Sequence, residues 1–308
     1  MTCSVYLERM AAYDSPGLDA AVARLLEASG FRPRPGERVL VKPNLVAPYN
    51  ATLSCTHPLV VRSACRYLAD CRARAVVGDS PAFGTARIVA GACGLDKALA
   101  GLPARIENFG ASRRLPLTLG GSIAVARAAL EADSILNVPR VKAHDQMLLT
   151  LAVKNLFGCV TGFRKALAHQ THGEKGRRFE SMILDVCLAM PPTYSLIDGV
   201  VAMHVSGPAK GRPYPLGLLG ASANPVALDA ALHAVLGLPV QASPLGREAL
   251  ERGLVREAVY PWLAPEAFDA SGFEPPRRLV GVAFKPARFL KGRLKSLYLS
   301  LTGRAPAA

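Results

Sequence analysis

The sequence predicts an α/β fold: a mainly parallel, Rossmann-like sheet with helices on both faces, followed by a basic C-terminal helix. Two observations predict it. Short apolar strands alternate with helical segments along most of the chain, and 50% of the 308 residues are hydrophobic. Continuously apolar strands are typical of a sheet buried on both faces, and alternation with helices is typical of parallel strands. With 19% charged residues, the composition also excludes a disordered or low-complexity chain.

The individual elements follow from turn signals and hydrophobic spacing. The first helix is expected from Ser15-Pro16 to Gly30, because serine and proline favour a helix start and glycine a helix end. Strands are expected at 38–42, 73–77, 105–108, 134–138, 194–197 and 216–219, and further helices at 58–69, 86–92, 95–100, 146–157, 179–190 and 225–236. Residues 199–215, rich in glycine and proline, are expected to form a long functional loop.

The chain divides into an α/β domain over 1–275, as one unit or two lobes, and a basic tail over 276–308. The tail has no acidic residue and eight basic ones, more than half of the net charge of +14. Its leucines, spaced 4-3-4 from Leu290 to Leu301, would share one helical face. The tail is interpreted either as a helix packed on the core or as a contact with anionic lipid or nucleic acid.

Several classes of protein are excluded. Prolines interrupt every long uncharged stretch, and no secretory signal is visible, so a cytoplasmic protein is expected. The seven cysteines are scattered without a C-x-x-C pair, which argues against a disulfide framework and against an iron–sulfur cluster of the chain's own. The G-x-G-x-x-G and Walker A motifs are absent, so the cofactor stays unknown.

Polar residues follow the predicted strands at their carboxyl ends. In an open α/β sheet, ligands bind beyond these ends, where loops from several strands converge. We therefore predict a ligand site from the residues at or after four apolar strands: Lys42, Asn44, Asp79, Ser80, Asn137 and Asp198.

The segment from Arg140 to Arg178 is the most basic part of the domain, with eight lysines and arginines and three histidines against two acids. It would form a cationic cavity suited to phosphate or carboxylate. The predicted catalytic residues are Lys142, His144, Lys154 and His169, and Asn155 and Lys165 complete the ligand-binding set. A histidine titrates near neutral pH and so suits general acid–base catalysis.

Two residues of this segment have alternative interpretations. Lys154 lies in an apolar run, which leaves three alternatives: its ammonium reaches water, burial lowers its pKa, or it contacts a bound anion. His169 and His172 are three residues apart and are weak metal candidates, but two histidines are an incomplete ligand set and no metal site is predicted.

A series of motifs runs in fixed order from about Arg38 to Gly237. The most specific is Val141-Lys-Ala-His144 followed by Leu151-Ala-Val-Lys-Asn-Leu-Phe-Gly158. The others are Val39-Leu-Val-Lys-Pro-Asn-Leu-Val46, Thr56-His-Pro58, Val77-Gly-Asp-Ser80, Ala132-Asp-Ser-Ile-Leu-Asn-Val-Pro139, Asp198-Gly199 and Ser222-x-x-Pro-Val-Ala-Leu-Asp229. The series resembles the family called domain of unknown function 362. Many relatives add a ferredoxin-like segment with cysteine-ligated clusters, which this chain lacks.

The order of His144, Lys154 or Lys165, and His169 is similar to the amino-terminal part of nickel-dependent lactate racemases. That resemblance implies proton transfer, attachment of a nickel-pincer nucleotide and metal ligation at these positions.

We therefore predict an enzyme, of isomerase, racemase or oxidoreductase type, that binds a small carboxylate or phosphorylated metabolite or cofactor. Lys42, Lys142 and Lys154 would hold the anion, and His144 and His169 would move protons. Asp79 and Asp198 would orient lysines or bind hydroxyls. One alternative is a redox protein whose iron–sulfur cluster or cofactor comes from a partner protein. The other is a module that binds anionic membranes or RNA; with 6% aromatic residues and no stacking platform, nucleic acid is the less favoured partner.

Overall fold

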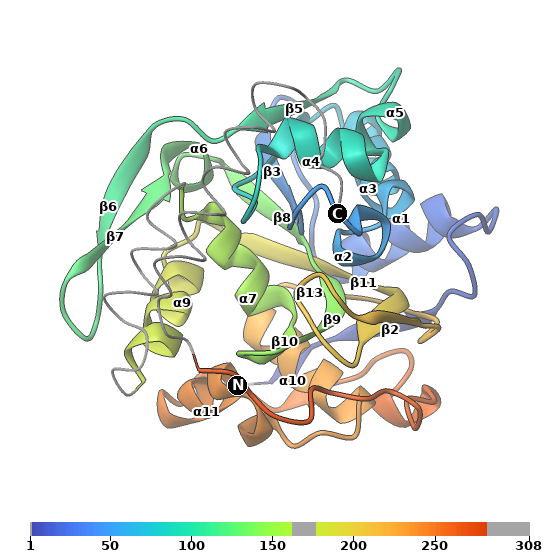
Figure 1. Cartoon of the computed structure of the whole chain (residues 1–308). Helices are drawn as coiled ribbons and strands as arrows, with labels where there is room; N and C mark the ends of the chain where they lie inside the picture. Colours follow the sequence, from blue (N-terminus) through green and yellow to red (C-terminus); the bar gives the residue numbers. More distant parts are fainter. Residues whose placement is uncertain (1, 162–176, 282–308) are drawn as a thin grey trace.

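The computed structural model describes residues 2–161 and 177–281, and a mostly parallel sheet runs through this part of the chain (Figure 1). Strand β3 (Arg38–Pro43) lies between β4 (Arg74–Asp79) and β8 (Ser134–Val138). Beyond β4 lies β5 (Ala104–Asn108), beyond β8 lies β11 (Thr193–His204), and all of these neighbours pair in parallel. The α/β class predicted from the alternating pattern is confirmed.

The sheet is extended beside β11. Strand β9 (Arg140–His144) pairs with it in parallel, and β12 (Arg212–Tyr214) and β13 (Leu218–Ser222) pair with it antiparallel. Two further strands join this extension: β10 (Leu148–Thr150) pairs with β9 and β2 (Tyr6–Arg9) pairs with β13, both antiparallel.

Helices cover both faces of the sheet, as predicted (Figure 1). Successive side chains of β3 point to opposite faces of the sheet, so both faces need a cover: Val39 and Val41 pack in one apolar cluster and Leu40 packs in another. The first cluster packs against α1 (Leu18–Ala28), α3 (Pro58–Asp70), α4 (Ala86–Cys93) and α5 (Leu95–Ala98). The opposite face packs against α7 (Ala152–Leu156), α9 (Arg178–Leu188), α10 (Pro225–Val235) and α11 (Pro244–Glu251).

The remaining described elements are short. They are β1 (Cys3–Ser4), α2 (Ala51–Ser54), β6 (Ser112–Pro116), β7 (Ser122–Ala126), α6 (Arg127–Leu130), η1 (Phe157–Cys159), η2 (Val240–Ala242), β14 (Ala258–Val259) and η3 (Pro265–Ala267). Strands β6 and β7 form a separate hairpin, and β1 pairs with β14. None of the helices in the described ranges is long and apolar enough to cross a membrane.

The helix predicted at 146–157 is wrong in its first half. Leu148 has a φ of +64°, which a right-handed helix does not contain, and residues 148–150 pair with β9 as strand β10. Only Ala152–Leu156 is α-helical. The apolar run fits both structures, and pairing with β9 decides between them.

The long loop predicted at 199–215 is also wrong. Strand β11 continues through Asp198-Gly199 to His204, and β12 lies within the same stretch. Gly199 does not end the strand, because it pairs with Leu218 of β13; a Cβ at this position would make a tight contact of 3.1 Å with the Leu218 carbonyl oxygen. The domain boundary at 275 stays a prediction, and most of the predicted tail helix lies outside the described residues.

Candidate functional site

The candidate site lies where the strand order reverses. The chain leaves β3 toward β4 on one side, and the later strand β8 returns to the other side of β3. Lys42 on β3 and Asn137 on β8 are paired in register at this point, near the carboxyl ends of both strands. Ligands of open α/β sheets bind beyond such a reversal, so the structure places these two predicted residues at the expected edge.

Lys42 is fully buried and all three of its N–H groups have acceptors. Its ammonium lies 2.9 Å from the Asp79 carboxylate, and it donates to the Pro43 carbonyl at 2.7 Å and to Asn155 Oδ1 at 3.4 Å. The carboxylate of Asp79 also accepts the backbone N–H groups of Leu45 and Ser80. The pair is therefore well satisfied, which a buried ion pair requires.

Three buried asparagines continue this network. Asn155 on α7 accepts from Asn44 Nδ2 at 2.8 Å and donates to Asn137 Oδ1 at 2.8 Å and to the Lys42 carbonyl at 3.1 Å. Asn137 donates in turn to the carbonyl of Ala152 and to Ser195 Oγ. Asn155 thus joins α7 to both sides of the strand reversal.

Lys142 on β9 meets the network through Asn44. Its ammonium donates to Asn44 Oδ1 and, at 2.8 Å, to the carbonyl of Ser54, and its side chain is almost fully buried. Burial, with a smaller contribution from the nearby charges of Arg140 and Lys154, lowers the pKa of Lys142 to about 7. This amine can therefore gain or lose a proton near neutral pH.

The other predicted site residues surround this network. His144 is buried, and its Nδ1 accepts the backbone N–H groups of Gln146 and Met147, which leaves Nε2 as the protonated nitrogen of the neutral ring. Lys154 is partly buried, with its ammonium 5.0 Å from the centre of the Phe157 ring. The backbone N–H of Ser80 donates to the Gly158 carbonyl.

Asp198 lies in a second polar cluster, apart from the lysine network. It accepts the Tyr13 hydroxyl at 2.8 Å and the backbone N–H of His57 at 2.9 Å. The Tyr13 and His57 rings are stacked with centroids 3.5 Å apart, and Arg140 donates to the Tyr13 oxygen. Burial and the Asp198 charge raise the pKa of Tyr13. This cluster connects the N-terminal loop, β11 and the start of α3. Asp198 therefore holds these three segments together beside the site.

Lys165, His169 and His172 lie outside the described residues. Over residues 2–161 and 177–281, no group of three histidine, cysteine, aspartate or glutamate side chains is placed to hold a metal ion.

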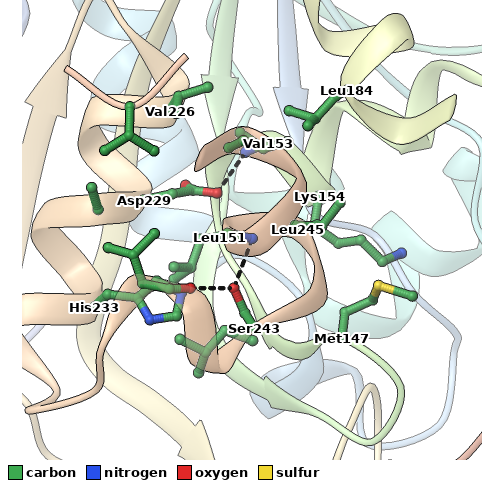
Figure 2. Close-up of a pocket in the computed structure, with 16 residues that line it drawn as sticks. Met147, Leu151, Val153, Lys154, Leu184, Val226, Asp229, His233, Ser243 and Leu245 are labelled. Atoms are coloured by element: carbon green, nitrogen blue, oxygen red, sulfur yellow. Dashed lines mark hydrogen bonds between the residues drawn. The ribbon is translucent and has the colours of Figure 1, made fainter. Parts of the chain in front are cut away.

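A narrow pocket opens beside α7 (Figure 2). Asp229 and His233, one turn apart on α10, lie on one side, and Lys154 and Met147 lie on the other. The remaining lining is mostly apolar, and the residues that contribute are Leu149, Leu151, Val153, Leu184, Val226, Ala230, Val240, Ser243, Leu245, Gly246, Ala249 and Val255. Lys154 lines this pocket, and its charge also acts on Lys142.

Asp229, His233 and Arg140 were not among the predicted site residues. The carboxylate of Asp229 accepts the N–H groups of Ala152 at 2.7 Å and Val153 at 3.2 Å, at the start of α7. A signal for β9 was present in the sequence: Arg140, Lys142 and His144 alternate with two apolar residues, the two-residue period of a strand. Asp229 ends the motif Ser222-x-x-Pro-Val-Ala-Leu-Asp229, but that motif gave it no role, and His233 carries no local signal because it lies in an apolar helix.

Comparisons with known proteins found similar chains. A "Thylakoid-associated protein" of Synechocystis is 33% identical to this chain over 307 residues, 97% of this chain and 96% of that protein. Among solved structures, the lactate racemase apoprotein from Thermoanaerobacterium thermosaccharolyticum is 12% identical with a TM-score of 0.45, and the match covers 73% of this chain and 57% of that one. A protein from Thermotoga maritima is 15% identical with a TM-score of 0.38, covering 61% and 50%. The chain spans only about half the length of these two structures.

The family comparison covers the site itself. The model described as domain of unknown function 362 matches residues 39–234, which include Lys42, Lys142 and Asp229. The match extends over more than half of the chain, and the relative from Synechocystis extends over nearly all of it. The chain therefore belongs to the family of domain of unknown function 362.

Proposed function

We propose that this protein is an enzyme that binds a small carboxylate or phosphorylated molecule beside Lys142 and Lys154 and moves a proton on it. The observation that carries the proposal is the position of Lys142. It is a buried amine on β9 that joins the network at the strand reversal through Asn44, and burial brings its pKa to about 7. A lysine with a pKa close to the working pH is suited to general acid–base catalysis.

The contacts of the two buried lysines suggest different roles. Lys142 donates to two acceptors in the described part of the chain, and a lysine has three N–H donors, so one can serve a ligand. Lys42 uses all three, on Asp79, Pro43 and Asn155. We therefore assign proton transfer to Lys142, and assign to Lys42 the positioning of Asn155.

Two neighbours complete the proposed chemistry. Lys154 is less buried than Lys142, so its ammonium is the better placed group to bind the substrate's negative charge. His144 follows Lys142 by two residues on β9, so both side chains are on the same face of the strand. Its protonated Nε2 can donate to a developing negative charge, or relay the proton.

Solvent isotope exchange tests this proposal. The protein would be incubated in D2O with a panel of small carboxylates and phosphorylated metabolites, and proton NMR would report loss of the signal next to the acidic group. We expect exchange with at least one compound and a fall of at least about 100-fold in Lys142→Met and His144→Gln, since general acid–base groups contribute roughly that much. Lys154→Met should also slow the exchange, because it removes the charge that binds the substrate.

Lys97→Met is the matched control, because Lys97 is exposed on α5, away from the strand reversal. It should exchange at the rate of the unmodified protein. Folded variants, verified by circular dichroism, that all keep the full rate would overturn the proposal.

A further inference from the structure

Three buried asparagine side chains form a chain of amides that ends at the Lys142 ammonium. The ammonium donates to Asn44 Oδ1, and Asn44 Nδ2 donates to Asn155 Oδ1 at 2.8 Å. Asn155 Nδ2 donates in turn to Asn137 Oδ1 at 2.8 Å. Every hydrogen bond of this amide chain therefore runs in one direction, from Lys142 toward Asn137.

Backbone carbonyls fix that direction. An amide side chain can present either its oxygen or its nitrogen to a neighbour, whereas a backbone carbonyl can only accept. Asn137 Nδ2 donates to the carbonyl of Ala152 at 3.0 Å, and Asn155 Nδ2 donates to the carbonyl of Lys42 at 3.1 Å. Both amides are therefore held with the nitrogen toward a carbonyl, and each turns its oxygen toward the next member of the amide chain.

The orientation of Asn44 follows from these contacts. Since Asn155 presents an oxygen, Asn44 must turn its Nδ2 toward Asn155 and its Oδ1 toward Lys142. A reversed Asn44 amide would place an NH2 group against the ammonium and an oxygen against an oxygen, with the loss of two buried hydrogen bonds. The backbone N–H of Asn44 also donates to Thr56 Oγ1 at 2.8 Å, which holds the residue in place.

We propose that Asn44 is a positioning residue for Lys142: its oriented amide oxygen, together with the Ser54 carbonyl, fixes the direction of the ammonium without neutralising its charge. A carboxylate in the same place would form an ion pair, as Asp79 does with Lys42, and would keep the proton on the amine. This inference rests on the proposed function, because it explains how Lys142 is held for proton transfer.

Other influences on Lys142 have to be kept apart from that of Asn44. Burial acts most strongly and lowers the pKa of Lys142 to about 7. Four neighbouring groups also act on its charge, two in favour of the ammonium and two against it: Cys55 and Asp79, and Arg140 and Lys154. A substitution of Asn44 leaves all four groups in the chain, so a matched pair of substitutions at this position measures the effect of Asn44 itself.

An NMR titration of Lys142 in the intact protein tests the inference without any substrate. With lysines labelled with carbon-13, the Cε signal of Lys142 reports its protonation, and its loss in Lys142→Met identifies it. We expect Asn44→Asp to raise the titration midpoint by about one to three pH units, the usual effect of an adjacent opposite charge. Asn44→Leu should lower the midpoint by about one to two pH units, because the charged form loses a hydrogen bond. A residue that only supports the fold would not produce opposite shifts.

Asn155→Leu tests the amide chain one step away from Lys142. Asn44 Nδ2 loses its acceptor in this variant, so the Asn44 oxygen is no longer held against the ammonium. The midpoint of Lys142 should fall, by less than in Asn44→Leu. This variant keeps the test available if Asn44→Asp does not fold.

Asn224→Asp is the matched control. It adds the same charge at the start of α10, where the side-chain oxygen accepts backbone N–H groups of that helix and the side-chain nitrogen contacts Cys3. Aspartate caps a helix as well as asparagine does, so this variant should fold and leave the midpoint of Lys142 unchanged.

The outcomes separate this inference from the proposed function. If folded Asn44→Asp and Asn44→Leu both keep the midpoint of the unmodified protein, or shift it in the same direction, the inference is wrong, and the isotope-exchange assay still decides the proposed function. If the two variants shift the midpoint in opposite directions but no compound exchanges, Asn44 positions Lys142 and the proposed function is wrong.

Discussion

Lys42 and Lys142 are both buried at the carboxyl edge of the sheet, and their partners differ in charge. Lys42 contacts a carboxylate, whereas the direct acceptors of Lys142 are an amide oxygen and a backbone carbonyl, both neutral. A buried charge is costly unless an opposite charge and hydrogen bonds satisfy it. Lys42 is therefore held in an ion pair with Asp79, whereas the pKa of Lys142 is lowered to about 7, close to neutral pH.

Gly158 is the residue on which the ion pair depends most directly. A Cβ at this position would overlap both the Asp79 carboxylate and the Lys42 ammonium. We expect Gly158→Ala to push the two charges apart and to lower the free energy of unfolding by about 1–3 kcal/mol, the usual cost of overpacking. Urea unfolding measures this change.

The control for that substitution is Gly91→Ala within α4. A Cβ there meets only the Asp96 carboxylate at an ordinary 3.6 Å. Because alanine favours helices over glycine by roughly 0.5–1 kcal/mol, this variant should be as stable as the unmodified protein or more stable. Equal stability of the two variants would show that the ion pair tolerates a side chain at Gly158.

At the scale of elements, the short helix α7 supports the site. It has only five residues, too few to be stable alone, yet it carries Lys154 and Asn155. Asp229 on α10 holds its first turn through two N–H groups. Burial raises the pKa of Asp229 to about 8, against the opposing effect of these two hydrogen bonds. Asp229 is therefore a positioning residue for the lysine network.

Replacing Asp229 with asparagine tests this support. The amide keeps one acceptor oxygen and loses the other. Above pH 8, where the Asp229 carboxyl is ionised, we therefore expect faster hydrogen exchange over 152–156 and a loss of about 1–2 kcal/mol of stability. Movement of Asn155 should also free Asn44 and change the rate at which acetic anhydride acetylates Lys142.

Ser243→Ala is the matched control for Asp229→Asn. Ser243 caps α11 by accepting the Gly246 N–H at 3.0 Å, and α11 contributes no residue to the lysine network. This variant should lose comparable stability while Lys142 reacts at its original rate. If acetic anhydride acetylates Lys142 at the same rate in both variants, Asp229 stabilises the fold but does not position the lysine network.

At the scale of the whole molecule, the buried groups make stability depend on pH. The pKa of Lys142 is about 7 in the folded protein and 10.5 as an unperturbed group, so the unfolded chain binds more protons between these values. Stability contributed at Lys142 therefore rises with pH from about 7 to 10.5. Asp229 acts in the opposite sense: its pKa is raised from 3.8 to about 8, so its effect on stability falls as pH rises through that window.

We predict that the contribution of Lys142 to stability rises from pH 8 to pH 10, with a limiting slope of roughly 1.4 kcal/mol per pH unit for one proton. Burial raises the pKa of the Cys65 and Cys187 thiols from 9.0 to about 12, so these groups act in the opposite sense above about pH 9, and the Lys142 contribution is the difference between the unmodified protein and Lys142→Met. Lys142→Met should flatten this rise, and Lys97→Met should preserve it. Urea unfolding at half-unit steps of pH would provide the slopes. A slope that Lys142→Met leaves unchanged would assign the pH dependence to other groups.

The sequence by itself determined the α/β class, the positions of most parallel strands and the polar residues at their ends. These features are local: apolar runs such as Val39 to Val41, and the turn residues that follow them, report on the backbone within a few residues. The predicted residues Lys42, Asn44, Asp79, Asn137, Lys142 and Asn155 meet in one hydrogen-bonded network.

Only the tertiary structure decided how these residues are used. Whether residues 148–150 form a helix or a strand depends on pairing with β9, and the support of α7 depends on Asp229, which lies 77 residues beyond Ala152. The state of Lys142 depends on burial by segments far apart in the chain. Desolvation and hydrogen bonding act through space, so the distances that set the pKa and the partners of each side chain exist only in the folded chain.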